Sequence, residues 1–446
     1  MIDRTVRAAA LGLAALFVLA GASPAPSAIS RYPTAFATDL GVTKLIGESD
    51  TDAAVSGVQI FIAAGLDRET PSTSGVASLV ADCITRTPVS SAAGAPAVAL
   101  RDAIIASGGS LTYTVDGRSV HFYVESRSER LAAAIALFGK ALAAPDFSPA
   151  TIATARASLQ SRIGELEGNA LSVGIAMFRR SYYTSGAGAP ALGNASTLAN
   201  LGSSDVAAFY AANYKRGAIN ASAVGAIAPA IGDALKNIAL TLPAGMNPPI
   251  VSKTRAIPQE APRIVAHRDV NAPWVVVGFA APPPGSKDFG AMLVLQKLLA
   301  DGFERDSATT LGFVEKSIGA FYLYDTSPAS LVVYVNGTQI DPSLALRQLL
   351  VVSRSLSLKP LGATPLAHFK VAAEGQFLTD SVSLSDRSYL LGTFASQGLG
   401  TDAINGALGA LEKTTAADVQ RVAKSYLQRY IVALVLPRVK AGDAAR

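Results

Sequence analysis

The chain has 446 residues, of which half are hydrophobic and 16% are charged. This composition excludes disordered, collagen-like and coiled-coil proteins, and the length predicts about three domains or two large ones. The formal net charge is +5 and the basic residues are spread along the chain, so we expect no nucleic-acid partner. One Cys excludes an intramolecular disulfide framework, and the three His lie far apart, with no pair at helical spacing.

The N-terminal residues have the pattern of an export signal. Two arginines precede an apolar run at residues 8–21, and small residues follow it up to possible cleavage sites at Ala22 and Ala28. The run is shorter than the roughly 20 apolar residues that a membrane span needs, although an uncleaved anchor remains an alternative. We therefore expect residues 1–28 to be a signal peptide. The mature protein should then be periplasmic or secreted, with no membrane contact.

Hydrophobic periodicity divides the first half into strands and helices. Alternating residues predict a strand at 55–65 and a hairpin at 109–126, whose two runs meet at Asp116 and Gly117. Apolar residues that recur with the helical period predict three helices, at 76–84, 128–142 and 148–166. The positions predicted to face the core are Val76, Leu79, Val80, Cys83 and Ile84, then Leu131, Ile135, Phe138 and Leu142, then Ile152, Ala155, Leu159, Ile163 and Leu166.

A similar order of elements recurs after a Pro-rich stretch at 241–263, which is typical of a linker. Patterns there predict a strand at 271–280, a helix at 289–303, strands at 319–327 and 329–337, and helices from 341 onward. Tyr113 and Tyr322 are 209 residues apart, and Glu129 and Asp341 are 212 apart. Similar offsets with a matching element order predict an internal duplication. Each half should be α+β, with helices packed on one face of an antiparallel-rich sheet.

Several segments, in the same order along the chain, resemble the insulinase and mitochondrial processing peptidase family of zinc metallopeptidases. They lie at residues 65–88, 104–117, 129–149, 188–214 and 414–427, and so extend over most of the mature chain. The resemblance implies the α+β fold of the processing peptidases, built from two homologous halves. The domains that we expect are a signal peptide at 1–28, an N-terminal peptidase-like domain at 29–240, a linker at 241–263, a C-terminal peptidase-like domain at 264–438 and a tail at 439–446.

The zinc motif of that family, H-x-x-E-H, is degenerate in this chain. Two His on one helical face ligate zinc, and the Glu between them acts as base toward the metal-bound water. The resemblance aligns Ser78, Ala81 and Asp82 with these residues, and Arg162 with a later Glu ligand, with Glu165 nearby. A cation in place of a ligand repels zinc. We therefore expect no catalytic residues, no metal and no cofactor in this chain.

Two interpretations of these positions remain open. In the first interpretation, an unorthodox site for a harder cation is formed by oxygen ligands from Ser78, Asp82 and Glu165. In the second, which the loss of the base Glu favours, Ser78 and Asp82 belong to a solvated helix face.

A second feature of the family is an Arg and a Tyr that help to bind substrate. The resemblance retains the Tyr as Tyr322 but puts Glu315 at the Arg position, with Lys316 beside it. Tyr322 and Lys316 are therefore the candidates for substrate binding, although aromatic residues are also common in strands for packing alone.

The remaining reactive side chains have no catalytic pattern around them. His121 should lie on a sheet face or face a partner, and His267 and His368 should have surface or packing roles. Cys83 should pack in the core.

The resemblance and the lost ligands together predict an insulinase-family homologue that is not an enzyme by itself. Some family members pair an active subunit with an inactive one. We therefore expect the non-catalytic subunit of an exported heterodimeric zinc metallopeptidase, which encloses and binds peptides while an H-x-x-E-H-bearing partner holds the zinc. One alternative is a structural or peptide-binding homodimer with no peptidase partner, since the core subunits of a respiratory complex resemble this family without needing proteolysis. The least favoured alternative is an active metalloendopeptidase with an altered site.

Overall fold

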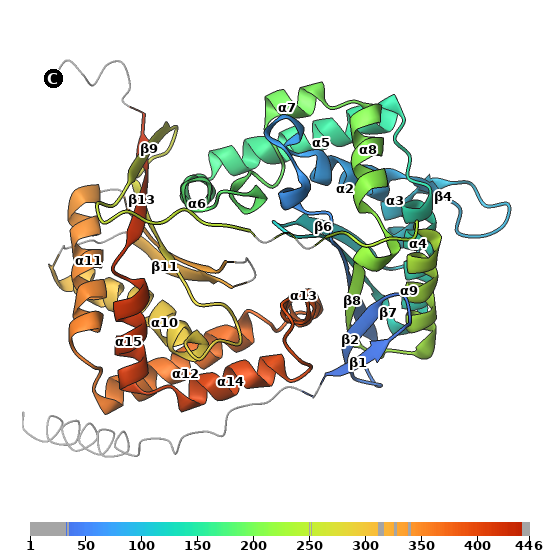
Figure 1. Ribbon diagram of the computed structural model, residues 1–446. Helices are drawn as coiled ribbons and strands as arrows, with labels where there is room; N and C mark the ends of the chain where they lie inside the picture. Colours follow the sequence, from blue (N-terminus) through green and yellow to red (C-terminus); the bar gives the residue numbers. More distant parts are fainter. Residues whose placement is uncertain are drawn as a thin grey trace, which may run out of the picture. The chain divides into compact units, whose positions relative to one another are not determined.

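The computed structural model describes the chain from residue 33 to residue 438 with short gaps (Figure 1). The described residues are 33, 35–248, 250, 252–310, 316–324, 328–337 and 340–438. The predicted signal peptide at 1–28 and tail at 439–446 lie outside them. In this part of the chain, none of the helices combines the length and the apolar character that crossing a bilayer requires.

The first half contains one large sheet, a short strand pair and eight α-helices among the described residues. Its strands are β1 (Phe36–Asp39), β2 (Lys44–Ser49), β3 (Val55–Ile62), β4 (Pro88–Val89), β5 (Val98–Ala99), β6 (Ser110–Val115), β7 (Val120–Arg127) and β8 (Ile219–Gly225). Its helices are α2 (Val76–Arg86), α3 (Leu100–Ala106), α4 (Leu131–Ala143), α5 (Pro149–Gly168), α6 (Ala170–Tyr182), α7 (Ala195–Asn200), α8 (Ser203–Asn213) and α9 (Pro229–Thr241).

The second half follows the predicted stretch at 241–263. Its strands are β9 (Arg263–Arg268), β10 (Trp274–Ala280), β11 (Lys316–Leu323), β12 (Ser330–Gly337) and β13 (Tyr430–Pro437). Its helices are α10 (Phe289–Thr310), α11 (Pro342–Leu358), α12 (Ala363–Thr379), α13 (Leu384–Ser396), α14 (Ala403–Lys413) and α15 (Ala416–Tyr426).

The two large sheets have the same strand topology. The first has the order β1-β2-β8-β3-β7-β6, and its strands pair antiparallel except for β2 and β8. The second has the order β11-β12-β10-β13-β9, and its one parallel pair is β13 and β9. Apart from β1, each strand of one sheet therefore has a counterpart in the other. This confirms the predicted duplication and the α+β class, and Tyr113 and Tyr322 lie on the corresponding edge strands β6 and β11.

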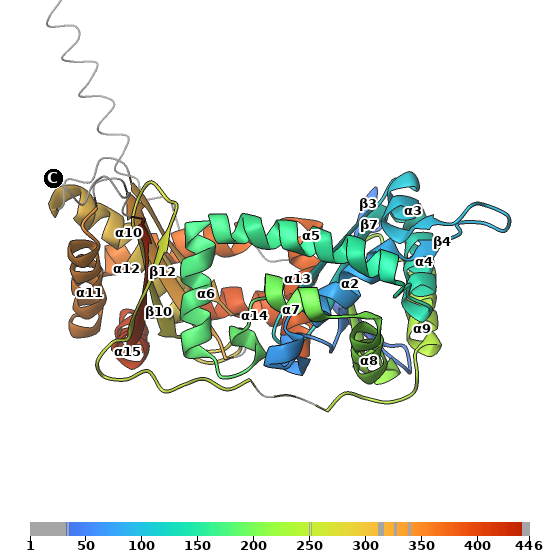
Figure 2. The ribbon, with the colours of Figure 1, turned by 90° about the horizontal axis from the view of Figure 1, so that it is seen from above.

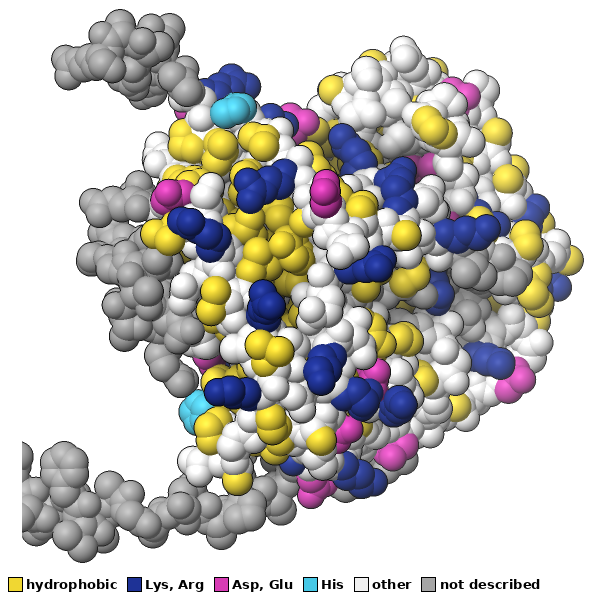
Figure 3. All heavy atoms as spheres, turned by 60° about the vertical axis from the view of Figure 1, so that its left-hand side comes forward, with side chains coloured by type: hydrophobic (Ala, Val, Ile, Leu, Met, Phe, Trp, Pro, Cys, Tyr) yellow, Lys and Arg dark blue, Asp and Glu magenta, His cyan; other side chains and the backbone are white. Residues whose placement is uncertain are grey.

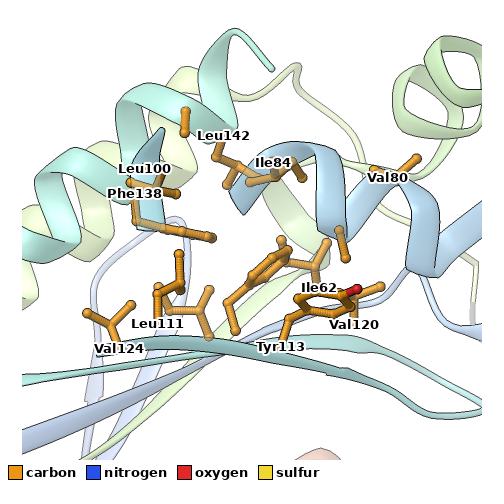
Figure 4. Close-up of a cluster of buried hydrophobic side chains, with 14 of the residues drawn as sticks. Ile62, Val80, Ile84, Leu100, Leu111, Tyr113, Val120, Val124, Phe138 and Leu142 are labelled. Atoms are coloured by element: carbon orange, nitrogen blue, oxygen red, sulfur yellow. The ribbon is translucent and has the colours of Figure 1, made fainter. Parts of the chain in front are cut away.

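Helices of the first half cover one face of the first sheet, as predicted. Figure 4 shows Ile84 of α2 and Phe138 of α4 on the side of the sheet where Leu111 and Tyr113 project, within one buried cluster. All the positions predicted to face this core are buried, with one exception. The prediction for Leu166 was wrong, because its side chain is 48% exposed near the C-terminal end of α5.

The opposite face of each sheet is covered by one helix from the other half, which the sequence did not predict. Helix α13 lies on the first sheet and α6 lies on the second (Figure 1). On the first sheet, the His121 ring stacks against both Phe61 and Tyr389, with centroid separations of 5.3 and 5.0 Å, and the rings of Phe61 and Tyr389 are 6.2 Å apart. His121 thus lies on a sheet face, as predicted, but α13 buries it. Helix α6 follows α5 directly. The side chain of Asn169 between them caps the N-terminus of α6, and the chain changes direction at this residue (Figure 2).

A buried ion pair also joins α13 to the first sheet. Arg387 donates two hydrogen bonds to the Glu48 carboxylate, at 2.9 and 2.6 Å, and both side chains are less than a tenth exposed. Nearby, the Ser222 hydroxyl donates to the Ser388 carbonyl oxygen at 2.5 Å. The two halves are therefore held together by exchanged helices and specific polar contacts.

Candidate functional site

Helix α2 begins at a turn that places its first residues against the sheet. Gly75 precedes it with φ of 95°, a conformation that favours glycine, and offers no capping side chain. The Glu69 carboxylate supplies the missing acceptors, at 3.0 Å from the Gly75 amide and 2.9 Å from the Ala77 amide. Burial raises the pKa of Glu69 to about 7, and these two amide hydrogen bonds act in the opposite direction.

The aligned positions on α2 are buried. Ser78 and Ala81 are fully buried, and Asp82 is 1% exposed. The prediction of a solvated helix face was therefore wrong. The helical period separated these residues from the apolar stripe, but the whole helix as far as Thr85 is covered by the sheet and by other helices.

Each polar side chain at these positions has an internal partner. The Ser78 hydroxyl donates to the Ala191 carbonyl oxygen at 2.6 Å. Asp82 forms an ion pair with Arg86, one helical turn away, through one carboxylate oxygen. The Tyr113 hydroxyl donates to the other oxygen of Asp82 at 3.2 Å. Both oxygens of the Asp82 carboxylate are therefore occupied by donors.

Arg162 completes this network from α5. Its guanidinium donates to the Tyr113 hydroxyl at 2.8 Å and lies 5.3 Å from the centre of the Tyr113 ring. Burial raises the pKa of the Tyr113 hydroxyl well above its usual range, and the Asp82 charge adds to the shift. The structure thus joins Asp82 and Arg162 through Tyr113, which was not among the candidate residues. Its position on an edge strand after a Gly-Gly pair gave no chemical signal.

These residues do not fit a zinc ion. Zinc takes imidazole, thiolate or carboxylate ligands in a tetrahedral arrangement. Here the Asp82 carboxylate is held by Arg86 and Tyr113, the Ser78 hydroxyl faces a carbonyl, and Arg162 brings a second guanidinium. Glu165 is exposed on α5. In the part of the chain that the structure describes, no three His, Cys, Asp or Glu side chains are grouped so as to hold a metal.

The candidates for substrate binding lie on the second sheet. Tyr322 is 6% exposed, and its hydroxyl donates to the Pro282 carbonyl oxygen while its ring packs against Phe289 and Tyr324. Burial raises the pKa of the Tyr322 hydroxyl well above its usual range. The residue lines a cavity of about 250 Å³ between α10, β11, α12 and α13. Lys316 begins β11, and Glu315 lies outside the described residues.

The three His are not brought together. His121 lies beneath α13, 3.0 Å from an Asp116 carboxylate oxygen. His267 is exposed on β9, with its Nδ1 3.2 Å from the Pro437 carbonyl oxygen, and His368 is exposed on α12. Cys83 is buried in the first core, and burial raises the pKa of its thiol to about 12. These positions agree with the surface and packing roles that were predicted.

Comparisons with known proteins agree with this fold. The model of the insulinase family, peptidase family M16, matches residues 44–188, and the model of the peptidase M16 inactive domain matches residues 200–345. A search of curated protein sequences finds no match. Among solved structures, a protease from Helicobacter pylori is 15% identical and has a TM-score of 0.80, with 91% of this chain and 100% of that chain covered.

Two further structures have similar folds. A peptidase M16 inactive domain from Pseudomonas fluorescens is 15% identical and has a TM-score of 0.78, with 92% of this chain and 98% of that chain covered. A chain of complex III2 from Candida albicans is 12% identical and has a TM-score of 0.74, with 90% of this chain and 95% of that chain covered. From its two family models, which together match more than half of the chain, and from its duplicated sheets, the chain belongs to the insulinase family, peptidase family M16, as a homologue with an inactive-type domain.

Proposed function

We propose that this chain is the non-catalytic subunit of an exported heterodimeric zinc peptidase, in which it binds peptides while an H-x-x-E-H-bearing partner carries zinc and the base. The observation that carries the proposal is the Arg86–Asp82–Tyr113–Arg162 network at the family's zinc position. An internally satisfied network stabilises the fold at this position and leaves no group there to activate water.

The edge of the first sheet supports peptide binding. Strand β6 is the last strand of that sheet, and its edge opposite β7 pairs with no described strand. Its side chains alternate, so that Leu111, Tyr113 and Val115 are buried while Ser110, Thr112 and Thr114 are exposed. An exposed edge with small polar side chains suits the addition of an extended peptide as a further strand. Because Tyr113 belongs to this strand, such a peptide would pass beside the degenerate centre.

Export is part of the proposal and rests on the apolar run at residues 8–21 after two arginines. Fractionation of the native host tests it, because an exported protein would be recovered outside the cytoplasm without its first residues. Recovery of the full chain in the cytoplasm would contradict this part.

The test of the subunit proposal is reconstitution with an active homologue. A protein of similar length that carries H-x-x-E-H, encoded next to this chain, would be co-expressed with it and purified through a tag on this chain alone. We expect a heterodimer that cleaves an unstructured peptide in a chelator-sensitive manner, whereas this chain alone does not cleave it. If this chain instead formed stable homodimers and the homologue did not co-purify with it, the result would contradict the proposal and favour the structural alternative.

A control separates the two subunits' contributions. Replacing the Glu of the homologue's H-x-x-E-H by Gln should abolish cleavage while the heterodimer still forms. Cleavage that survives this replacement would assign the chemistry to the present chain and would contradict the proposal.

A further inference from the structure

An open groove lies beside the degenerate centre, between α5, α6, the segment 188–193 and the end of β9. We call it the arginine groove. Its volume is about 350 Å³, which is within the range of sites for small ligands and short peptide segments. Ile163 and Ala191 both line it. Because Ile163 follows Arg162 and the Ala191 carbonyl accepts the Ser78 hydrogen bond, the groove adjoins the network described above.

The charged side chains of this groove are mostly cationic. Arg179 and Arg180 come from α6 and Arg268 from β9, whereas Glu167 is the one carboxylate in the lining. The Arg179 Nε donates to the Ala187 carbonyl oxygen, and an Arg268 nitrogen donates to the His267 carbonyl oxygen. Within the described residues, none of the three guanidinium groups forms an ion pair with a carboxylate. Their positive charge is therefore not neutralised by the fold.

Apolar side chains accompany these charges. Val173, Met177 and Leu192 line the groove, and Leu166 beside them is 48% exposed. Leu166 continues the apolar stripe of α5 beyond the residues that the core covers, which is why its burial was wrongly predicted. A ligand that covered Leu166 would remove apolar surface from water.

Charge complementarity defines the occupant. Guanidinium groups bind carboxylates through paired hydrogen bonds, and adjoining apolar side chains favour an aliphatic or aromatic group beside the acid. The same combination occurs more widely on one face of the molecule, where hydrophobic side chains gather between Lys and Arg side chains (Figure 3). A short peptide segment with Asp or Glu next to an apolar residue provides both features.

We propose that the arginine groove binds acidic peptide segments, with carboxylates at Arg180 and Arg268 and an apolar side chain against Leu166. The proposal rests on the proposed peptide-binding function and adds the class of peptide that is selected. Peptides with neutral amides in place of the acids would bind less tightly, because the guanidinium charges would remain uncompensated.

The test compares two fluorescein-labelled peptides with purified full-length protein. One contains Asp and Glu on both sides of Leu and Val, and the other has Asn and Gln at the acidic positions. Fluorescence anisotropy at low salt should show the acidic peptide binding about tenfold more tightly, and added salt should reduce the difference. The double variant Arg180→Gln/Arg268→Gln should lose most of this preference but retain the weaker binding of the amide peptide. Leu166→Ser should weaken both peptides.

A matched control is the double variant Arg130→Gln/Arg347→Gln, which removes the same charge from exposed positions just before α4 and on α11. It should bind both peptides like the original protein, and circular dichroism should show all variants folded. The groove proposal would be overturned if the two peptides bound with equal affinity, or if the two double variants changed the affinities equally. The proposal that the chain binds peptides would not be affected by either result. No binding of either peptide by the original protein would overturn both proposals.

Discussion

Arg162 donates a hydrogen bond of 2.8 Å to the Tyr113 hydroxyl and thereby places a guanidinium group at the end of the network that holds Asp82. The two residues are 49 positions apart, on α5 and β6. Their contact joins two elements into one network at the positions that the resemblance aligns with the family's zinc ligands. At these positions the resemblance puts a carboxylate in place of an imidazole and a guanidinium in place of a carboxylate, and Tyr113 links the two groups.

Removal of the Asp82 charge tests whether this network stabilises the fold. We expect Asp82→Asn to lower the free energy of unfolding by about 1–3 kcal/mol, because a buried acceptor of two hydrogen bonds becomes a poorer partner for Arg86 and Tyr113. Urea denaturation measures this change. Asp102→Asn, at an exposed position on α3, should cost much less. Equal effects of the two substitutions would show that the network does not contribute.

The ion pair between Glu48 and Arg387 should hold α13 on the first sheet. Glu48→Gln removes the buried charge that accepts two hydrogen bonds from Arg387, and we expect a loss of about 3–5 kcal/mol in the free energy of unfolding. Hydrogen exchange should also become faster in α13 than in the rest of the second half.

The control for this pair is Glu129→Gln, which breaks the ion pair with Arg127 at side chains that are 56% and 67% exposed. It should change stability by about 0–1 kcal/mol, because water already solvates both charges. Unchanged exchange of α13 in Glu48→Gln would contradict the role assigned to the buried pair.

A single glycine allows α13 to approach the sheet. A Cβ atom at Gly392 would lie 2.0 Å from Phe61 Cε2 and 2.8 Å from Ser222 Oγ. We therefore expect Gly392→Ala to destabilise the protein by about 1–3 kcal/mol. Gly375→Ala in α12, where a Cβ would meet no atom within 4 Å, should instead stabilise it by about 0.5–1 kcal/mol. Thermal unfolding of the two variants should give shifts of opposite sign, and equal shifts would refute the close approach.

The cap of α2 should make stability depend on pH. The folded-state pKa of Glu69, about 7, is higher than its value of 4.5 in the unfolded chain, because burial disfavours the carboxylate. The folded state therefore holds the proton more tightly, and this contribution to stability is complete below pH 4.5 and is lost as pH rises through 7. Relative to Glu69→Gln, the original protein should lose stability between pH 5 and pH 8 in urea denaturation. Parallel pH profiles would contradict the assignment.

The sequence predicted the parts of the fold that depend on local pattern. The hairpin at Asp116 and Gly117, the apolar stripe of α4 and the recurrence of the element order are all present, because turn residues and period determine them locally. The exchange of α6 and α13 was missed. An alternating strand such as β7 shows that two faces differ, but not which distant helix covers the second face.

The candidate site was predicted in position but not in environment. Ser78, Asp82 and Arg162 do lie in one region, as the resemblance implied, yet the first two are buried and not solvated. Their partners come from a carbonyl at Ala191 and from the hydroxyl of Tyr113, and no local periodicity links these segments to α2. Burial of a polar helix face depends on such distant partners.

Metal analysis of the purified chain tests the central claim most directly. After incubation with excess zinc and gel filtration, inductively coupled plasma mass spectrometry should find far less than one zinc per chain, and the protein should not cleave an unstructured peptide. The variant Ser78→His/Ala81→Glu/Asp82→His/Arg162→Glu restores the family's ligands and serves as the matched comparison. Stoichiometric zinc with chelator-sensitive cleavage by the unaltered chain would contradict the account.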